Sequence, residues 1–141
     1  MENTEFQNTV SEALQGAEKA CRELSQHVVQ SGNHLRTGDI QKGNDLLAGI
    51  LDDFGQLVSF LDDMGQCHDL ADSVRNSILD NIAMESTQTV ELLNMAFTAQ
   101  ENHDWVFLAD VLEYELSEKI ESWSNIFGGL VKLQETSLAS V

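Results

Sequence analysis

The 141-residue chain contains no proline. Proline removes a backbone donor and its ring clashes inside a helix, so its absence leaves long helices uninterrupted. Apolar residues recur at alternating three- and four-residue steps along nearly the whole chain, which is the period of a helix with one buried face. The clearest such stretch is Ile40, Gly43, Leu47, Ile50, Phe54, Leu57, Leu61 and Met64. The sequence therefore predicts an all-helical protein.

Basic residues are also scarce, with 7 Lys and Arg against 24 Asp and Glu and a net charge of −17. The imbalance is concentrated in residues 43–118, where 16 acidic residues accompany one basic residue, Arg75. A field of this sign repels phosphate and anionic lipid, so we expect neither nucleic acid nor a membrane surface as a partner. Two interpretations of the acidic segment stay open. It is either a solvated coat that maintains solubility or a docking face for a basic or amphipathic partner.

Cysteines and long apolar runs are equally few. Cys21 and Cys67 are the only cysteines, and neither stands in a Cys-x-x-Cys motif. They do not form a disulfide framework, and we expect two reduced thiols. Residues 1–5 lack the apolar core of a signal peptide, and no run approaches the roughly 20 apolar residues of a membrane span. These absences predict a cytoplasmic protein.

The apolar stripes predict four helices, at about residues 5–31, 39–64, 69–100 and 104–127. Gly32 and Asn33 are typical of a helix stop, and the turn at residues 37–39 precedes the second helix. Asp104 is the expected cap of the fourth helix. Gly128 and Gly129 are expected to weaken or end that helix, which leaves the state of the tail at residues 130–141 open.

The connections between these helices are short, which favours antiparallel neighbours. We therefore expect one domain, residues 1–141, folded as an up-down-up-down antiparallel four-helix bundle. The second and fourth helices each follow a long helix through a tight turn that contains an aspartate. Two related helical hairpins would explain this pattern, and so would helical periodicity alone.

Motifs for catalysis and for metal binding are absent. A di-iron bundle needs Glu three residues before His, but Leu24, Ser31, Gly65 and Gln100 occupy those positions before the four histidines. The chain also has no calcium loop, no glycine-rich phosphate loop and no nucleophile elbow. We therefore expect a protein that is not an enzyme and carries no metal or other cofactor.

Four polar residues on the apolar stripes fall at similar heights in an antiparallel bundle. They are His27 of the first helix, Glu85 and Thr89 of the third, and Glu115 of the fourth. At a rise of about 1.5 Å per residue, all four lie within about two helical turns of one level. Three interpretations stay open: side chains that extend past the rim to water, a register-fixing contact between His27 and Glu115, or a ligand site.

The second helix is apolar over a wider arc than one seam requires. Its extra residues are Leu46, Leu51, Val58 and Phe60, and Tyr114 adds an aromatic ring on the fourth helix. This surface is either a wider core or a groove for a partner helix or a second copy of the chain.

Residues 96–123 contain Asn102, Asp104, Asp110, the run Glu113-Tyr114-Glu115 and a closing Trp123. This segment resembles the C-terminal part of small, acidic, helical proteins of Firmicutes whose function is uncharacterised. Residues 38–62 look like the second helix of the same proteins. That helix is also similar in plan to the flagellin-specific export chaperones. These are cytosolic helical bundles around which a flagellin tail wraps.

Charge, surface and resemblance together favour a non-enzymatic protein-binding module. The resemblance implies a cytosolic chaperone or adaptor that binds an amphipathic segment of a protein or peptide partner. The alternative is a self-associating homodimer with a structural role. A groove that stays open in one chain would favour the first hypothesis, and a two-fold interface over the extra apolar stripe would favour the second.

Overall fold

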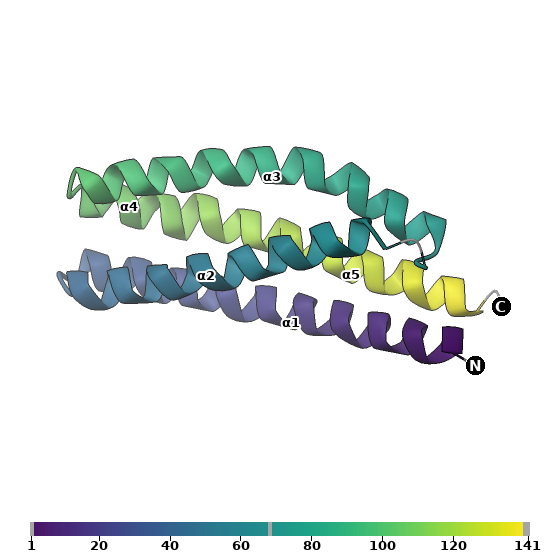
Figure 1. Cartoon of the computed structure of the whole chain (residues 1–141). Coiled ribbons are helices and arrows are strands. Elements are labelled where there is room, and N and C mark those ends of the chain that lie inside the picture. The colour runs from purple at the N-terminus through teal and green to yellow at the C-terminus, as the bar shows by residue number, and fades with distance from the viewer. Residues whose placement is uncertain (1, 68, 140–141) are drawn as a thin grey trace.

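The computed structural model describes residues 2–67 and 69–139 of the chain. This part is helical almost throughout and contains no strand, so the all-helical prediction is confirmed. The elements are α1 (Glu2–Arg36), α2 (Ile40–Gly65), α3 (Asp72–Glu101), α4 (Trp105–Asp110), the π-helical segment η1 (Val111–Leu116) and α5 (Ser117–Ala139). Because α4, η1 and α5 follow one another without a break, they form one continuous rod (Figure 1).

The long helices lie side by side, and each runs opposite to the one before it (Figure 1). α1 and α2 are close near their connecting turn, where the Ser31 hydroxyl donates to the Gly43 carbonyl at 2.7 Å. A Cβ atom at Gly43 would lie 2.7 Å from Leu35 Cγ, so glycine permits this approach. Towards the other end, α2 leaves α1 and passes over α5, as Figure 1 shows. There Phe60 of α2 stacks on Phe127 of α5, with ring centroids 6.4 Å apart.

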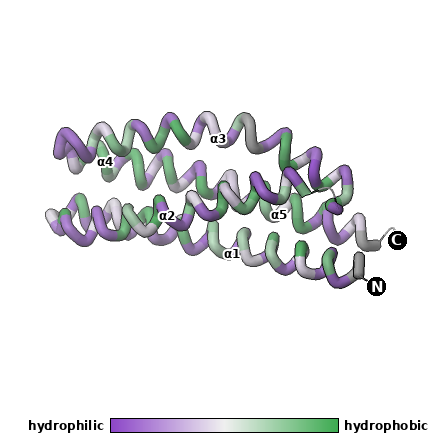
Figure 2. Tube along the Cα trace, viewed as in Figure 1, coloured by the Kyte–Doolittle hydropathy of each residue, from purple (hydrophilic) through white to green (hydrophobic). Residues whose placement is uncertain are grey.

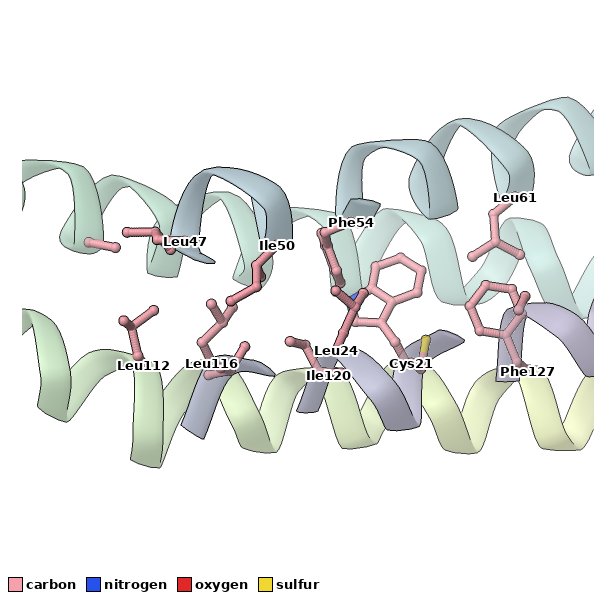
Figure 3. Packing of buried hydrophobic residues seen from close by; sticks show 14 of the residues in the cluster. Cys21, Leu24, Leu47, Ile50, Phe54, Leu61, Leu112, Leu116, Ile120 and Phe127 are labelled. Carbon is pink, nitrogen blue, oxygen red and sulfur yellow. The ribbon is translucent and has the colours of Figure 1, made fainter. Parts of the chain in front are cut away.

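One apolar core of buried residues joins the helices. Figure 2 shows hydrophobic and hydrophilic residues alternating along each helix. Trp123 is the largest side chain among those fully buried, and Phe54 meets it edge-on with ring centroids 5.6 Å apart. Figure 3 shows Leu47, Ile50 and Phe54 of α2 facing residues of the other helices. Burying one such side chain contributes about 1.5–3 kcal/mol. The core is thus built from the stripes that the sequence shows.

α1 ends in a glycine turn, six residues beyond the predicted stop. Gly38 has φ of 86°, its N–H donates to the Leu35 carbonyl at 3.4 Å, and the Asp39 N–H donates to His34 at 2.8 Å. These two bonds form a Schellman motif, in which a left-handed glycine ends the helix. The predicted cap at Asp104 is confirmed, because its carboxylate accepts the Phe107 N–H at 3.2 Å.

The stop predicted at Gly32 is wrong, because the helix continues through it to Arg36. Gly32 is buried, and a Cβ atom there would lie 2.7 Å from Glu113 Cγ. Glycine at this position therefore serves close packing of α1 against η1. Arg36, one turn further on, bonds Asp110 at 2.6 Å and Glu113 at 3.1 Å, and these partners hold α1 against the end of the rod.

The π-helical segment explains a run of four-residue steps in the apolar seam. Leu108, Leu112, Leu116 and Ile120 are all buried, although each four-residue step overshoots an α-helical turn by about 40°. Over three such steps the seam would rotate by about 120° away from the core in a regular α-helix. The wider turns of η1 absorb this excess, so all four side chains stay on one line.

The glycine pair near the C-terminus does not end the last helix, which continues to Ala139. Leu130 is 1% exposed, and Gln134 is fully buried and donates to Gln7 of α1. Two internal glycines cost about 2 kcal/mol of helix propensity, and this burial offsets the cost. The helix beyond the glycine pair therefore packs on the core through Leu130 and Gln134, while residues 140 and 141 lie outside the described part. At the other connection, α3 begins at Asp72 rather than at residue 69.

Candidate functional site: a groove between α1 and α2

The divergence of α1 and α2 leaves a groove between them. Its main cavity measures about 460 Å³. The lining residues from α1 are Ala13, Gly16, Ala17, Ala20, Glu23, Leu24 and His27, and those from α2 are Asp53, Gln56, Leu57 and Phe60. We call this cavity, together with the end pocket described next, the α1–α2 groove. Along α1 it extends from Phe6 to His27, a length of about 31 Å at 1.5 Å per residue.

The end of the groove near the chain termini is a second, smaller pocket of about 270 Å³. It shares Ala13 and Phe60 with the main cavity, so the two are continuous. Its other lining residues are mostly apolar: Phe6, Thr9, Val10, Asp63, Met64, Cys67 and Leu70. A pocket of this size and character suits one bulky apolar side chain of a ligand or partner.

Small residues of α1 form the wall of the main cavity. Ala13, Gly16 and Ala20 follow one another at three- and four-residue steps, so they line one face of the helix. A Cβ atom at Gly16 would meet no atom within 4 Å, which shows that the space beside it is open. A partner backbone can therefore approach α1 closely along this face.

The far end of the groove is acidic. Glu23 and Asp53 face it from opposite helices, and the exposed His27 lies beside them. Neither carboxylate is held by a basic side chain of the described residues. A Lys or Arg of a partner could bond both acids, so the groove combines an apolar end with an end that suits a cation.

A polar layer does lie between α3 and α5, but with partners that differ from those predicted. Glu85 Oε2 accepts from Lys119 Nζ at 2.8 Å, and Lys119 also donates to Gln88. The Thr89 hydroxyl accepts the Trp123 indole N–H at 3.1 Å and donates to the Glu85 carbonyl at 2.7 Å. Glu85 and Thr89 are thus buried polar residues with satisfied partners.

The predicted contact between His27 and Glu115 is wrong. His27 is exposed at the α1–α2 groove, whereas Glu115 is exposed at a different cavity, between α3 and the rod. The side chains leave the axis on different sides of the molecule, so equal height does not bring them together. Lys119 takes the place of His27 as the cationic partner of the layer.

The predicted partner surface is divided by the structure. Leu51, Val58 and Phe60 are half-buried and pack against the core, and Leu46 is also half-buried. Of the five residues predicted for this surface, only Phe60 lines the α1–α2 groove. Tyr114 is 66% exposed on η1, where the Arg36 guanidinium carbon lies 5.9 Å from its ring centroid. The five residues therefore do not form one surface, and most of the wide arc of α2 belongs to the core.

A family model matches residues 6–126, most of the chain, and its description is a domain of unknown function, DUF8042. The chain belongs to this family. The matched segment contains all of the groove's lining residues on α1 and α2. No curated protein and no solved structure matches the chain. Membership of DUF8042 agrees with the resemblance to an uncharacterised family and assigns no activity.

The two thiols lie in different surroundings. Cys21 is buried, and burial, followed by the nearby Glu18 carboxylate, raises the pKa of its thiol to about 12. Cys67 is half-buried at the apolar end of the groove. In the part of the chain that the structure describes, no group of three or more His, Cys, Asp or Glu residues is placed to hold a metal ion. Nor is any helix of that part long and apolar enough to cross a bilayer.

Sequence reasoning missed Lys119 and the small-residue wall of the groove. Lys119 precedes the seam residue Ile120, and because lysines usually lie in water, its position gave no signal of a buried cation. The signal for the wall was present, since Ala13, Gly16 and Ala20 share one helical face. Small residues also occur inside tightly packed helix pairs, so the pattern alone did not distinguish a groove from a contact.

Proposed function

We propose that this protein is a non-enzymatic protein-binding module whose α1–α2 groove holds an amphipathic helix of a partner protein. The observation that carries the proposal is the groove itself, which stays open and largely apolar in a single chain. An amphipathic helix that lays its apolar face into such a groove is a recurrent mode of protein recognition.

The shape and charge of the groove define the partner segment. A bulky apolar side chain of the partner would fill the pocket between Phe6 and Phe60, and small residues would pass Gly16. A Lys or Arg would reach Glu23 and Asp53 at the other end. The length of about 31 Å corresponds to a helix of about 20 residues.

Charge also favours a different protein over a second copy of this chain. The net charge is −17, so two copies repel each other before they meet. A basic segment is attracted by the same field. The homodimer remains the alternative proposal, and it requires an interface of about 1,600 Å² that overcomes this repulsion.

A chaperone or adaptor in the cytosol is the role that such binding would serve. A chaperone of this kind covers the apolar face of a segment until that segment reaches its assembly. We also propose that the chain is related in plan to the flagellin-specific export chaperones and to small acidic helical proteins of Firmicutes. We propose further that its two halves arose as related helical hairpins.

The binding test uses a labelled helical peptide of about 20 residues, with one Trp, several Ala and a distal Lys on one face. Fluorescence anisotropy measures its dissociation constant for the wild-type chain and for two variants. Gly16→Leu fills the groove, whereas Gly49→Leu adds the same side chain on exposed α2, where a Cβ atom also meets nothing within 4 Å. Both changes leave the charge unaltered.

We expect Gly16→Leu to weaken binding about tenfold or more and Gly49→Leu to leave it unchanged. A scrambled peptide of the same composition should bind much more weakly to the wild-type chain, which separates groove binding from attraction by charge alone. Equal binding to the wild-type and Gly16→Leu chains would refute the proposal. A dimer in sedimentation equilibrium that Gly16→Leu disrupts would favour the homodimer instead.

A further inference from the structure

Apolar side chains are exposed mainly on α3. Nine large hydrophobic residues are exposed in the described part of the chain, and five of them lie on α3: Leu79, Met84, Val90, Met95 and Phe97. The proposed function does not use them, because the α1–α2 groove lies on other helices. A concentration of exposed apolar side chains on one element marks an interaction surface more often than chance exposure does.

Three of these residues form a straight row. Leu79, Val90 and Phe97 are separated by 11 and 7 residues, which correspond to about three and two helical turns. Their exposed fractions are 51%, 54% and 43%. The row is about 27 Å long at 1.5 Å per residue, which suits a partner helix of about 18 residues.

The row runs beside α2. At one end, Leu79 Cδ2 lies 3.3 Å from the position of a Cβ atom at Gly65. At the other end, the Gln100 side chain donates to the Asn44 side chain at 3.0 Å. α2 and α3 are antiparallel between these two contacts, so Val90 lies roughly level with Phe54, and Phe97 with Leu47.

The outer side of α2 leaves this row uncovered. Ala48, Gly55 and Ser59 follow one another at seven- and four-residue steps there, and all three are exposed. A Cβ atom at Gly55 would meet nothing within 4 Å. The apolar row of α3 and the small row of α2 therefore lie side by side on one exposed face, which we call the α2–α3 trough.

Acidic side chains border the trough on both sides. Asp52 and Asp62 lie on the outer side of α2, and Asp80 lies on the outer side of α3; all three are exposed. α2 contains one basic residue, Lys42, which lies in its first turn beside Asp39, and α3 contains Arg75, which lies 3.6 Å from Asp72. The two helices together thus carry ten acidic residues and two basic ones.

From the row, the small residues and the acidic border we infer that the α2–α3 trough is a second docking surface, for a basic amphipathic helix of a protein partner. The apolar face of that helix packs on Leu79, Val90 and Phe97. Lysine or arginine residues on both flanks of its apolar face meet the carboxylates of α2 and α3. A second copy of this chain would place acid against acid here, and an anionic lipid surface would be repelled in the same way.

The test uses an isotope-labelled chain and a helical peptide of about 18 residues, with a row of leucines flanked by lysines on both sides. Amide chemical shifts locate the bound peptide and give its dissociation constant. Val90→Ser shortens the row without a change in charge. Val106→Ser is the matched control, because Val106 is an equally apolar, 65% exposed residue of α4 outside the trough.

We expect shifts centred on residues 79–97 and 48–59, and a loss of affinity of about fivefold to tenfold in Val90→Ser but not in Val106→Ser. Binding should also weaken as salt shortens the range of the field. Shifts that scatter over all acidic residues, or equal affinities for the wild-type and Val90→Ser chains, would overturn the inference. So would a dimer of the chain alone that Val90→Ser dissociates.

The two proposed docking surfaces can be tested independently of each other. Gly16→Leu blocks the groove and leaves the α2–α3 trough untouched, and Val90→Ser does the reverse. The trough is supported only if the leucine-row peptide still binds residues 79–97 in the Gly16→Leu chain. If Gly16→Leu abolishes those shifts, the peptide occupies the groove and the second surface is refuted.

Discussion

Lys119 of α5 spans the interface to α3 and places its ammonium nitrogen 2.8 Å from Glu85 Oε2. The two side chains are 13% and 11% exposed, so water screens the pair only weakly. This ion pair joins the third helix to the last one. Together with the bonds from Lys119 to Gln88 and from Trp123 to Thr89, it fixes the register of α3 against the rod.

Removal of one partner of this ion pair should destabilise the fold. Lys119→Met leaves the Glu85 carboxylate mostly buried without a cation, so we expect a loss of about 2–4 kcal/mol in the free energy of unfolding. The double variant Lys119→Met with Glu85→Leu should lose less than this single variant, because no charge is then left unpaired. Urea unfolding followed by circular dichroism measures all three chains.

Glu115→Gln is the control for this experiment. Glu115 is exposed and lines the same cavity between α3 and the rod as Lys119, but it does not belong to the ion pair. It should change stability by less than about 0.5 kcal/mol. If Lys119→Met is as mild as Glu115→Gln, the ion pair does not contribute to the fold.

Gly32 and Gly49 should respond in opposite directions to the same substitution. Gly32→Ala forces a Cβ atom to within 2.7 Å of Glu113 Cγ, which should cost about 1–3 kcal/mol. Gly49→Ala meets no neighbour within 4 Å and should stabilise the chain by about 0.5–1 kcal/mol through helix propensity. Thermal unfolding of both variants tests this. Stabilisation by Gly32→Ala would show that α1 and η1 are not in close contact.

The helix beyond the glycine pair should contribute to global stability. Leu130 is 1% exposed, and Leu130→Ala should cost about 2–4 kcal/mol through lost burial and a cavity. The half-buried Leu133, one turn further on, provides the comparison, and Leu133→Ala should cost less. Equal and negligible effects of the two substitutions in urea unfolding would mean that the tail does not pack on the core.

Cys21 should resist alkylation in the folded chain. Burial raises the pKa of its thiol from 9.0 to about 12, so at about pH 8 almost no thiolate is present to react. Cys67 is half-buried and should react first with iodoacetamide. Mass spectrometry of the native and the unfolded chain identifies the modified residue. Rapid modification of Cys21 before unfolding would contradict its burial.

The same pKa shift has a defined sign in stability. The Cys21 thiol loses its proton more readily in the unfolded chain, so its contribution to stability is complete below about pH 9 and falls between about pH 9 and 12. Cys21→Ala should flatten this part of the stability curve relative to the wild type, whatever its effect at neutral pH. An unchanged slope in urea unfolding at alkaline pH would count against the shift.

Much of the fold was predictable, because helical periodicity and capping act between residues that are close in sequence. The seam of α2 and the cap at Asp104 follow from patterns within a few residues. The error at Gly32 has a different origin, since the same residue type ends helices and permits close packing. Whether Glu113 lies against it depends on a segment 81 positions away in the chain.

The candidate site was predicted only in part for the same reason. For Phe60 the sequence left open a wider core or a partner groove, and the residue both packs on the core and lines the α1–α2 groove. Glu85 and Thr89 were candidates for a polar layer, and they lie in one with Lys119 and Trp123. The partners of these residues depend on the rotation of each helix about its own axis. A height estimated from residue numbers contains no information about that rotation, so His27 was paired wrongly with Glu115.

The sequence by itself determined that the chain is helical, acidic throughout its middle, and amphipathic along nearly every helix. These are properties of composition and of spacing within one helix. Only the tertiary structure decided that α2 diverges from α1 and opens a groove, that Lys119 neutralises Glu85, and that an apolar row of α3 stays uncovered. Each of these depends on distances between helices, which packing of the whole core sets and no single helix specifies.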